Sequence, residues 1–289
     1  MIVDLDTLKT FMGIPETDDS ENELLNIYLQ GVDSLFNDLC DYEFDSTTYT
    51  HELHNGGGQR LWLKHIPVTA ITQLSTERIP AIKIKNTSSD AARCTIDVDV
   101  SASYLYYAIV GGTNATARTG IDLAAAATDT LAELVTAIDA LGKGWDAEIY
   151  DTDLNSIPSS ELLEVMGLNC GVPRGGGAAT WKYLDIPGTP LGGEFRLESE
   201  EEGMIYCPSG FPSGINNVIV TYTAGYSSTT MPRSLKLAVC AGAQALYNKG
   251  EEDGFGVQGF TIGALRLSYA DWLPDITLQA MSRYKRKSI

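Results

Sequence analysis

The sequence has few of the features that mark membrane-inserted or secreted proteins. No apolar run reaches the ~18 to 20 residues that a membrane-spanning helix needs, and the first residues lack the basic region and apolar core of a signal peptide. Cysteines are few and include no Cys-x-x-Cys pair; they are Cys40, Cys94, Cys170, Cys207 and Cys240. We therefore expect a protein without membrane contact, with reduced cysteines, in a cytosolic compartment.

Basic residues are also scarce. The 289-residue chain has 20 Lys and Arg against 38 Asp and Glu, and a net charge of −18. Residues 1–75 hold 13 acidic and 3 basic side chains, residues 76–188 hold 15 and 8, and residues 189–289 hold 10 and 9. We do not expect such a chain to bind nucleic acid by neutralising phosphates. The charge fits either simple solubility or an acidic wall along which a DNA duplex could slide.

No motif in the sequence indicates an enzyme. A Gly-x-Gly-x-x-Gly pattern at 254–259 lacks the preceding strand and the following helix of a dinucleotide site. Residues 151–155 begin like a calcium loop, but Ser156 and Leu162 stand where such a loop needs Gly and Glu. The chain has no Gly-x-Ser-x-Gly nucleophile turn, and no pair of carboxylates is distinguished by its spacing. We predict no catalytic residue, no cofactor-binding residue and no cofactor.

The histidines do not predict a metal site. His51 and His54 are one residue short of the His-Glu-x-x-His spacing of zinc proteases. On the strand that we expect here, residues three apart point to opposite faces of the sheet. We therefore predict that no residue of this chain binds a metal.

A strand followed by a helix is predicted near the C-terminus. Residues 218–226, Val-Ile-Val-Thr-Tyr-Thr-Ala-Gly-Tyr, are rich in β-branched and aromatic residues. Gly225 can take the positive φ that ends such a strand, and Pro232 suits the first turn of a helix. The apolar residues of 234–247 fall on one helical face; they are Leu235, Ala238, Val239, Gly242, Ala245 and Leu246.

The N-terminal part predicts two helices and a hairpin. Residues 5–14 read as a short helix that ends near Gly13. Ser20 and Glu23 form a capping-box pattern ahead of a long helix. Its expected buried stripe is Leu24, Leu25, Tyr28, Val32, Leu35, Phe36 and Leu39. Two short strands, 49–53 and 59–63, flank an Asn-Gly-Gly-Gly turn and predict a β-hairpin.

This order of elements resembles that of the head–tail connector (adaptor, or neck) family of tailed bacteriophages. The shared patterns are a Leu-x-x-Leu-Lys-x-x-x-Gly-Ile helix at 5–14 and an acidic Asp-Asp-Ser-Glu-Asn-Glu-Leu-Leu run at 18–25. The third is a succession that begins at residue 218, in which a strand ending in Tyr-Thr-Ala-Gly-Tyr is followed by a proline and a helix. The two matching stretches cover about half of the chain, and it is the order of the motifs that makes them informative.

The resemblance implies a structural protein of the virion neck, made in the host cytoplasm during assembly. Family members form a homo-oligomeric ring, usually of twelve copies, under the portal protein. The ring extends the DNA channel and is a platform for a head–tail stopper or tail-completion protein. Double-stranded DNA would pass through its lumen without specific binding. The resemblance also implies portal docking by the C-terminal segment, for which the candidate residues are Arg283, Lys285, Arg286 and Lys287.

A segment of different character separates the two matching stretches. It predicts strands at 82–84, 94–100, 104–110 and 145–150, and helices over 130–141 and 159–166. We therefore predict an α+β fold. Residues 1–75 plus 189–289 would form a discontinuous helical connector core with β-hairpins, interrupted by a small inserted α+β domain at 76–188.

The aromatic residues of the predicted insert leave a second function open. They would suit a ligand- or carbohydrate-binding module of a phage attachment structure; the residues are Tyr104, Tyr106, Tyr107, Trp145 and Trp181. Aromatic residues that alternate along strands are more often core residues. The family resemblance implies no role for this segment.

Overall fold

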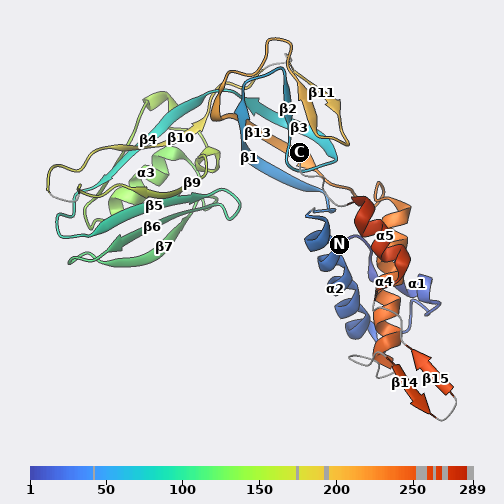
Figure 1. Cartoon of the computed structure of the whole chain (residues 1–289). Coiled ribbons are helices and arrows are strands. Elements are labelled where there is room, and N and C mark those ends of the chain that lie inside the picture. Colours follow the sequence, from blue (N-terminus) through green and yellow to red (C-terminus); the bar gives the residue numbers. More distant parts are fainter. Residues whose placement is uncertain are drawn as a thin grey trace. The chain divides into compact units, whose positions relative to one another are not determined.

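The computed structural model describes residues 1–41, 43–173, 176–191, 195–251, 259–262, 265–268 and 273–284. Contacts within the chain divide it into two compact units (Figure 1). Unit 1 consists of Met1–Thr47, His65–Val68 and Ala224–Ile289, and unit 2 of Thr48–Lys64 and Thr69–Thr223. Among the described residues, no helix is both long and apolar enough to cross a membrane.

Unit 1 contains four of the helices. They are α1 (Leu5–Met12), α2 (Asn22–Cys40), α4 (Arg233–Glu251) and α5 (Asp275–Tyr284). The Asp4 carboxylate caps α1 by accepting a hydrogen bond from the Thr7 N–H at 2.7 Å, and Gly13 ends the helix with a φ of 74°. The capping box predicted at Ser20 is wrong, because the Ser20 hydroxyl donates to Asp18 and α2 begins without a side-chain cap.

The two ends of the chain build one hydrophobic core in unit 1. Its buried members come from α2, α4 and α5 and include Leu25, Leu29, Val32, Phe36, Leu235, Ala238, Val239, Ala280 and Met281. Gly242 lets α4 lie close to α2, because a Cβ at that position would stand 3.0 Å from Val32 Cγ1. Gly225 has a φ of 98°, as predicted, and a Cβ there would meet the Asp45 carbonyl oxygen.

Unit 2 contains two three-stranded sheets near the chain segments that join it to unit 1. The first has the order β1-β13-β3, from Thr47–Gly56, Gly214–Ala224 and Val68–Ser75. The second has the order β11-β12-β2, from Arg196–Ser199, Met204–Tyr206 and Arg60–Trp62.

The hairpin predicted over 49–63 is wrong. The strands β1 and β2 pair with β13 and β12 instead of with each other. The glycine turn between them is held by the distant loop before β13. Gly57 N–H donates to the Phe211 carbonyl at 3.2 Å, and Gly56 N–H donates to Asn217 Oδ1 at 2.9 Å. The turn therefore leads the chain from one sheet to the next.

The rest of unit 2 consists of two further sheets and one helix, which share a hydrophobic core (Figure 1). One sheet has the order β10-β4-β8, from Lys182–Pro187, Arg78–Asn86 and Trp145–Ile149. The other has the order β7-β6-β5-β9, from Thr116–Asp122, Tyr104–Val110, Arg93–Asp99 and Val165–Asn169. The helix α3 (Leu131–Ala140) begins at the predicted Thr130 and Glu133 capping box, which forms.

The helix predicted over 159–166 is wrong. One short 3₁₀ turn, Ser159–Glu161, is followed by strand β9, which pairs with β5.

A second 3₁₀ turn, Thr152–Leu154, follows Asp151, whose carboxylate accepts the Asp153 N–H at 3.1 Å. This contact makes residues 151–155 a capped turn.

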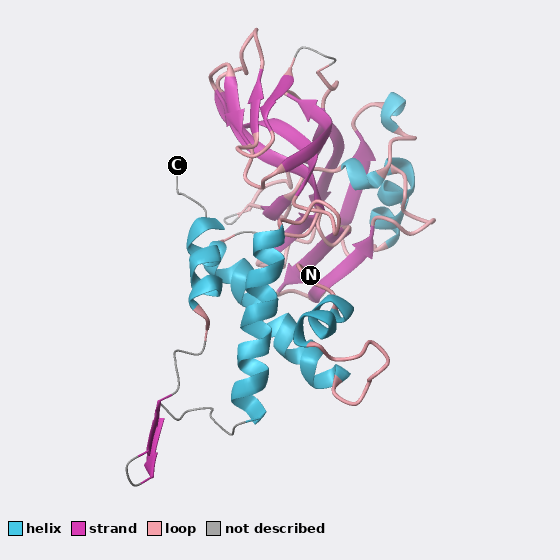
Figure 2. Ribbon diagram, turned by 90° about the vertical axis from the view of Figure 1, so that its right-hand side faces the viewer, coloured by secondary structure: helices cyan, strands magenta, loops and turns pink. Residues whose placement is uncertain are grey.

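The predicted fold class is wrong. Strands hold more residues than helices, and the sheets are mostly antiparallel (Figure 2). The segments expected to decorate a helical core as hairpins instead form sheets of their own, and β13 is the central strand of one of them. The insertion of residues 76–188 stays a prediction. Its strands share one core whose buried members run from Ala81 to Ile186.

The last described strands form a short hairpin. They are β14 (Gly259–Ile262) and β15 (Leu265–Ser268), which pair antiparallel. The Gly-x-Gly-x-x-Gly pattern at 254–259 lies outside the described residues except for Gly259.

Candidate functional site

Helix α2 has a second apolar stripe, of which all members except the half-buried Leu35 are exposed to solvent. Leu24, Ile27, Gly31, Leu35 and Leu39 follow one another at spacings of three or four residues, and the Ile27 side chain is 59% exposed. We call these five residues the α2 stripe. Of the residues expected in the core, Leu25, Val32 and Phe36 are buried, whereas Leu24 and Leu39 are exposed. Leu29 and Cys40 are also buried, although they were not predicted.

Helix α4 exposes a contrasting face. Leu237 is 43% exposed and lies one turn after Arg233, which is also exposed. We call Arg233, Leu237, Ala241 and Gln244, which share one helical face, the α4 face. Apolar side chains thus remain at the surface of both long helices of unit 1.

The charges of these two helices are opposite. Helix α2 contains Glu23, Asp33 and Asp38 and no basic residue, whereas α4 contains Arg233, Lys236 and Lys249 and no acidic residue before Glu251. The same separation holds for the two halves of unit 1. Residues 1–47 contain 12 acidic and one basic side chain, and residues 224–289 contain 5 acidic and 8 basic. Surfaces of opposite charge favour contact between different faces of neighbouring copies.

The predicted portal-docking residues lie at the end of the chain. Arg283 is exposed in the last turn of α5, and its guanidinium carbon lies 6.0 Å from the centre of the Tyr284 ring. Lys285, Arg286 and Lys287 lie outside the described residues. Portal docking by this basic segment stays a prediction.

The cysteines are buried. All five lie inside the protein, and none of them is joined in a disulfide. Burial raises the pKa of the Cys170 thiol to about 12 and that of the Cys240 thiol to about 11. Neither is a thiolate at neutral pH, so neither can act as a nucleophile there.

The histidines of unit 2 face carboxylates. His51 Nε2 lies 3.3 Å from Glu161 Oε2, and His54 Nε2 lies 2.6 Å from Glu52 Oε1. Hydrogen bonds from His51 and Gln73 hold the pKa of Glu161 below its usual value. No group of three or more possible metal ligands exists among the described residues. The His51–Glu161 pair joins β1 to the turn at Ser159–Glu161, whereas His54 and Glu52 lie on the same strand. Sequence reasoning missed the first pair because His51 and Glu161 are distant in the chain.

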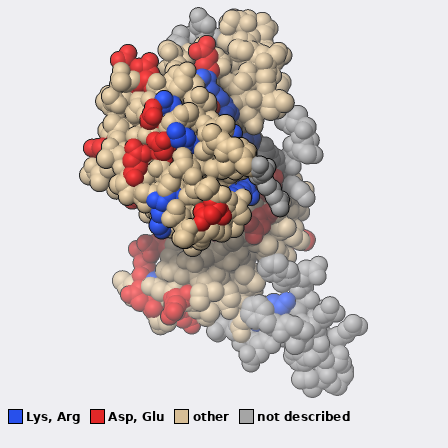
Figure 3. All heavy atoms as spheres, turned by 90° about the vertical axis from the view of Figure 1, so that its left-hand side faces the viewer, with Lys and Arg blue, Asp and Glu red and all other residues tan. Residues whose placement is uncertain are grey.

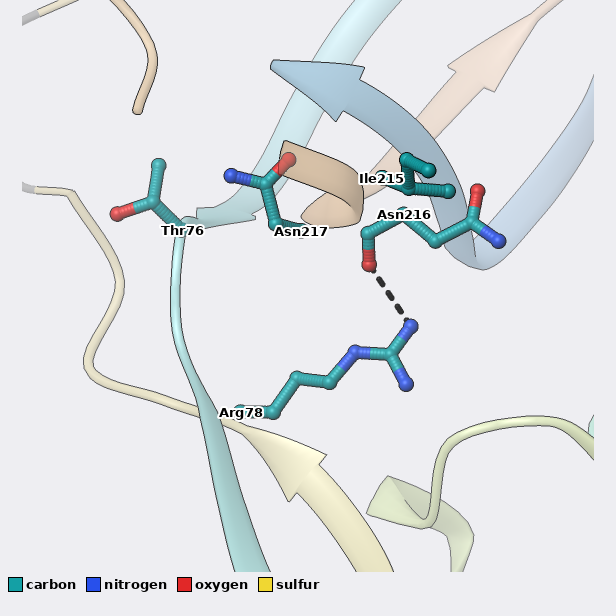
Figure 4. A pocket seen from close by; sticks show the side chains of 5 residues that line it. All are labelled: Thr76, Arg78, Ile215, Asn216 and Asn217. Carbon is teal, nitrogen blue, oxygen red and sulfur yellow. Dashed lines mark hydrogen bonds between the residues drawn. The ribbon is translucent and has the colours of Figure 1, made fainter. Parts of the chain in front are cut away.

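A pocket of about 430 Å³ opens beside the start of β4 (Figure 4). It is lined by Thr76, Arg78, Ile215, Asn216 and Asn217. Arg78 Nη2 donates to the Asn216 carbonyl at 2.8 Å, and Asn217 is held by the Pro212 carbonyl and the Gly56 N–H. No carboxylate, imidazole or thiol is among these lining residues, so the pocket offers no general base. Its polar groups mainly join β4 to the start of β13.

Comparison with known proteins adds only a weak likeness to solved structures. No family model and no curated protein matches this chain. Among solved structures, a chain described as the neck of an empty gene transfer agent (GTA) particle, computed with C6 symmetry, aligns with 100% of this chain and 91% of that chain. The identity is 11% and the TM-score is 0.36. A TM-score this low does not establish a shared fold, and we draw no structural argument from it.

Proposed function

We propose that this protein is a structural component of the neck of a tailed-phage type of particle. In this proposal it is a head–tail connector whose copies form a ring under the portal protein. The ring extends the DNA channel and offers a platform to a head–tail stopper or tail-completion protein. The protein acts by binding and assembly, not by catalysis.

The observation that carries this proposal is the pair of contrasting faces on unit 1. A closed ring of identical copies needs two different faces that fit one another. The α2 stripe is apolar, the α4 face combines Leu237 and Ala241 with Arg233 and Gln244, and the two lie on helices of opposite charge. The motif order shared with the connector family supports the same role, since the helices that carry these faces are the ones that carry the motifs.

The location of the protein in purified particles tests the proposal. An antibody against the protein, visualised with gold in the electron microscope, should label the junction between head and tail. Particles made without the protein should contain packaged heads that have not joined tails. Absence of the protein from purified particles, or labelling of the tail tip alone, would contradict the neck role.

The basic C-terminal segment gives a finer test of portal docking. Changing Lys285, Arg286 and Lys287 to Glu should slow attachment to isolated portal rings several-fold at low salt, because charge steering is strongest when screening is weakest. The wild-type and changed proteins should attach at more similar rates as salt rises. Equal rates at low salt would show that portal docking uses another surface. Arg283 lies in the last turn of α5, ahead of the three lysine and arginine residues changed above. Arg283→Glu therefore tests the helical part of the basic segment separately in the same assay.

A further inference from the structure

One sheet of unit 2 has an open face with an ordered set of side chains. In the sheet β10-β4-β8, Tyr183 pairs with Lys83, which pairs with Glu148 on the other side. Lys85 pairs with Asp146 in the next outward position, and Trp181 precedes β10. The inward positions Ile82, Ile84, Ala147 and Leu184 are in the hydrophobic core. The outer face therefore has an aromatic row, a basic row and an acidic row.

The aromatic row is unusually accessible for such large side chains. Tyr183 is 47% exposed and Tyr150, just after β8, is 54% exposed. Their ring centres lie 5.8 Å apart with an interplanar angle of 77°, so the two rings form an edge-to-face pair at the surface. The Trp181 ring is partly covered, because the Lys85 ammonium lies 3.8 Å from its centre.

The charges on this face are already paired. Lys83 Nζ lies 2.5 Å from Glu148 Oε2, and Lys85 Nζ lies 2.9 Å from Asp146 Oδ2. Acidic and basic side chains also lie next to one another on the face of unit 2 that Figure 3 shows. A polyanion such as nucleic acid would meet the two carboxylates, and a polycation would meet the two ammonium groups. The face therefore suits an uncharged ligand with many hydrogen-bonding groups.

We propose that the outer face of β10-β4-β8 binds a neutral oligosaccharide. The apolar C–H face of a sugar ring stacks on the Tyr183 ring and contacts Tyr150. The sugar hydroxyls donate to the carboxylates of Asp146 and Glu148 and accept from the ammonium groups of Lys83 and Lys85. This activity goes beyond the neck role, and neither depends on the other.

A second aromatic pair in unit 2, which is half-buried, provides a control. Tyr104 and Tyr106, on β6, stack at 5.6 Å with an interplanar angle of 20°. The Arg118 guanidinium lies 3.5 Å from the centre of the Tyr106 ring. Because Arg118 and Tyr104 already stack on Tyr106, this ring offers a sugar less free surface than Tyr183 does.

The test uses the full chain and an array of neutral oligosaccharides, with heparin fragments and single-stranded DNA as charged probes. We expect a neutral oligosaccharide to bind and the charged probes not to bind. Tyr183→Ala should weaken binding about tenfold or more, Tyr183→Phe should keep most of it, and Tyr106→Ala should leave it within about twofold. Circular dichroism and thermal melting of each variant check that its fold is intact.

Several outcomes would overturn the proposal. These are a failure of every neutral oligosaccharide to bind, equal binding by Tyr183→Ala, or binding of heparin or DNA alone. Capture of a purified neck or portal protein through Tyr183, with no oligosaccharide binding, would instead make this face a protein interface. Location of the protein in the particle is a separate readout, so failure here leaves the neck proposal untouched.

Discussion

The two units of this protein arrange charge and apolar surface in opposite ways. In unit 1 the charged residues of α2 are all acidic and those of α4 before Glu251 are all basic, and both helices expose apolar side chains. In unit 2 opposite charges meet within one sheet face, as Lys83 and Lys85 do with Glu148 and Asp146. Unit 2 thus pairs these charges within one chain, whereas the separated charges of α2 and α4 are what the proposed contact between copies would use.

The largest effect is expected from a large-to-small substitution in the hydrophobic core of one unit at a time. Phe36 is fully buried in unit 1 and packs edge-to-face on Phe44 at 6.4 Å. Phe36→Ala should lower the free energy of unfolding of unit 1 by about 3 to 5 kcal/mol. Hydrogen exchange should rise in α2 and α4 and stay unchanged in the strands around Ile96.

The matched variant lies in the other core. Ile96 is fully buried in unit 2, and Ile96→Ala should cost about 2 to 5 kcal/mol there. In Ile96→Ala, hydrogen exchange should rise in the strands around Ile96 and stay unchanged in α2 and α4. If either variant raised hydrogen exchange equally in both cores, the two units would unfold together, and they would not be independent in stability.

A smaller effect is expected at Glu161, which faces His51 in unit 2. Because the hydrogen bond from His51 lowers the pKa of Glu161, the carboxylate stabilises the fold above its unfolded pKa of about 4.5. This stabilisation is lost as the pH falls through the lower folded pKa. Glu161→Gln should cost about 1 kcal/mol at pH 7, since the carboxylate is 39% exposed and partly screened.

Urea unfolding of both proteins at pH 7 and near pH 3 measures this effect. The difference between wild type and Glu161→Gln should shrink toward zero at the lower pH. A difference that stays constant with pH would mean that the ionised carboxylate does not contribute. Glu164→Gln, close in the chain and exposed, is the control and should behave like wild type at both values.

The smallest effect on unit 1 is expected from removing the predicted insert. Replacing residues 76–188 by a short Gly-Ser linker should leave α1, α2, α4 and α5 folded. Changing the length of a loop alters its closure free energy by only about 0.6 kcal/mol per doubling. Circular dichroism should show cooperative unfolding of the remaining helices. Loss of that cooperativity would show that residues 76–188 belong to the same folding unit as the helices.

Local periodicity predicted most helices but not which strands pair. The stripe from Leu235 to Leu246 and the Thr130 and Glu133 capping box are short-range signals, and α4 and α3 form where they indicated. Strands β1 and β2 looked like a hairpin because an Asn-Gly turn joins them. Their actual partners lie more than 130 residues away along the chain, a distance over which sequence periodicity gives no information. For this reason the predicted fold class was wrong, and the protein has more residues in strands than in helices.

The functional surfaces were predictable only in part. The acidic N-terminal and less acidic C-terminal parts were visible in the composition. The α2 stripe was not, since the predicted buried stripe was too wide and included Leu24 and Leu39, which are exposed. Of the five aromatic residues singled out, Tyr107 and Trp145 pack into the core. Tyr183 and Tyr150 were missed because only the sheet register brings β8 and β10 to the two sides of β4.

Mixing two variants tests most directly whether the α2 stripe binds the α4 face of another copy. Ile27→Asp alters only the first surface and Leu237→Asp only the second, and both positions are exposed, so the folds should persist. Concentration-dependent sedimentation should show self-association of the wild type and monomers for each variant alone. An equimolar mixture should contain a one-to-one dimer, because it retains one intact pair of faces, and no larger species. A mixture that stays monomeric, or variants that still associate like the wild type, would contradict this account.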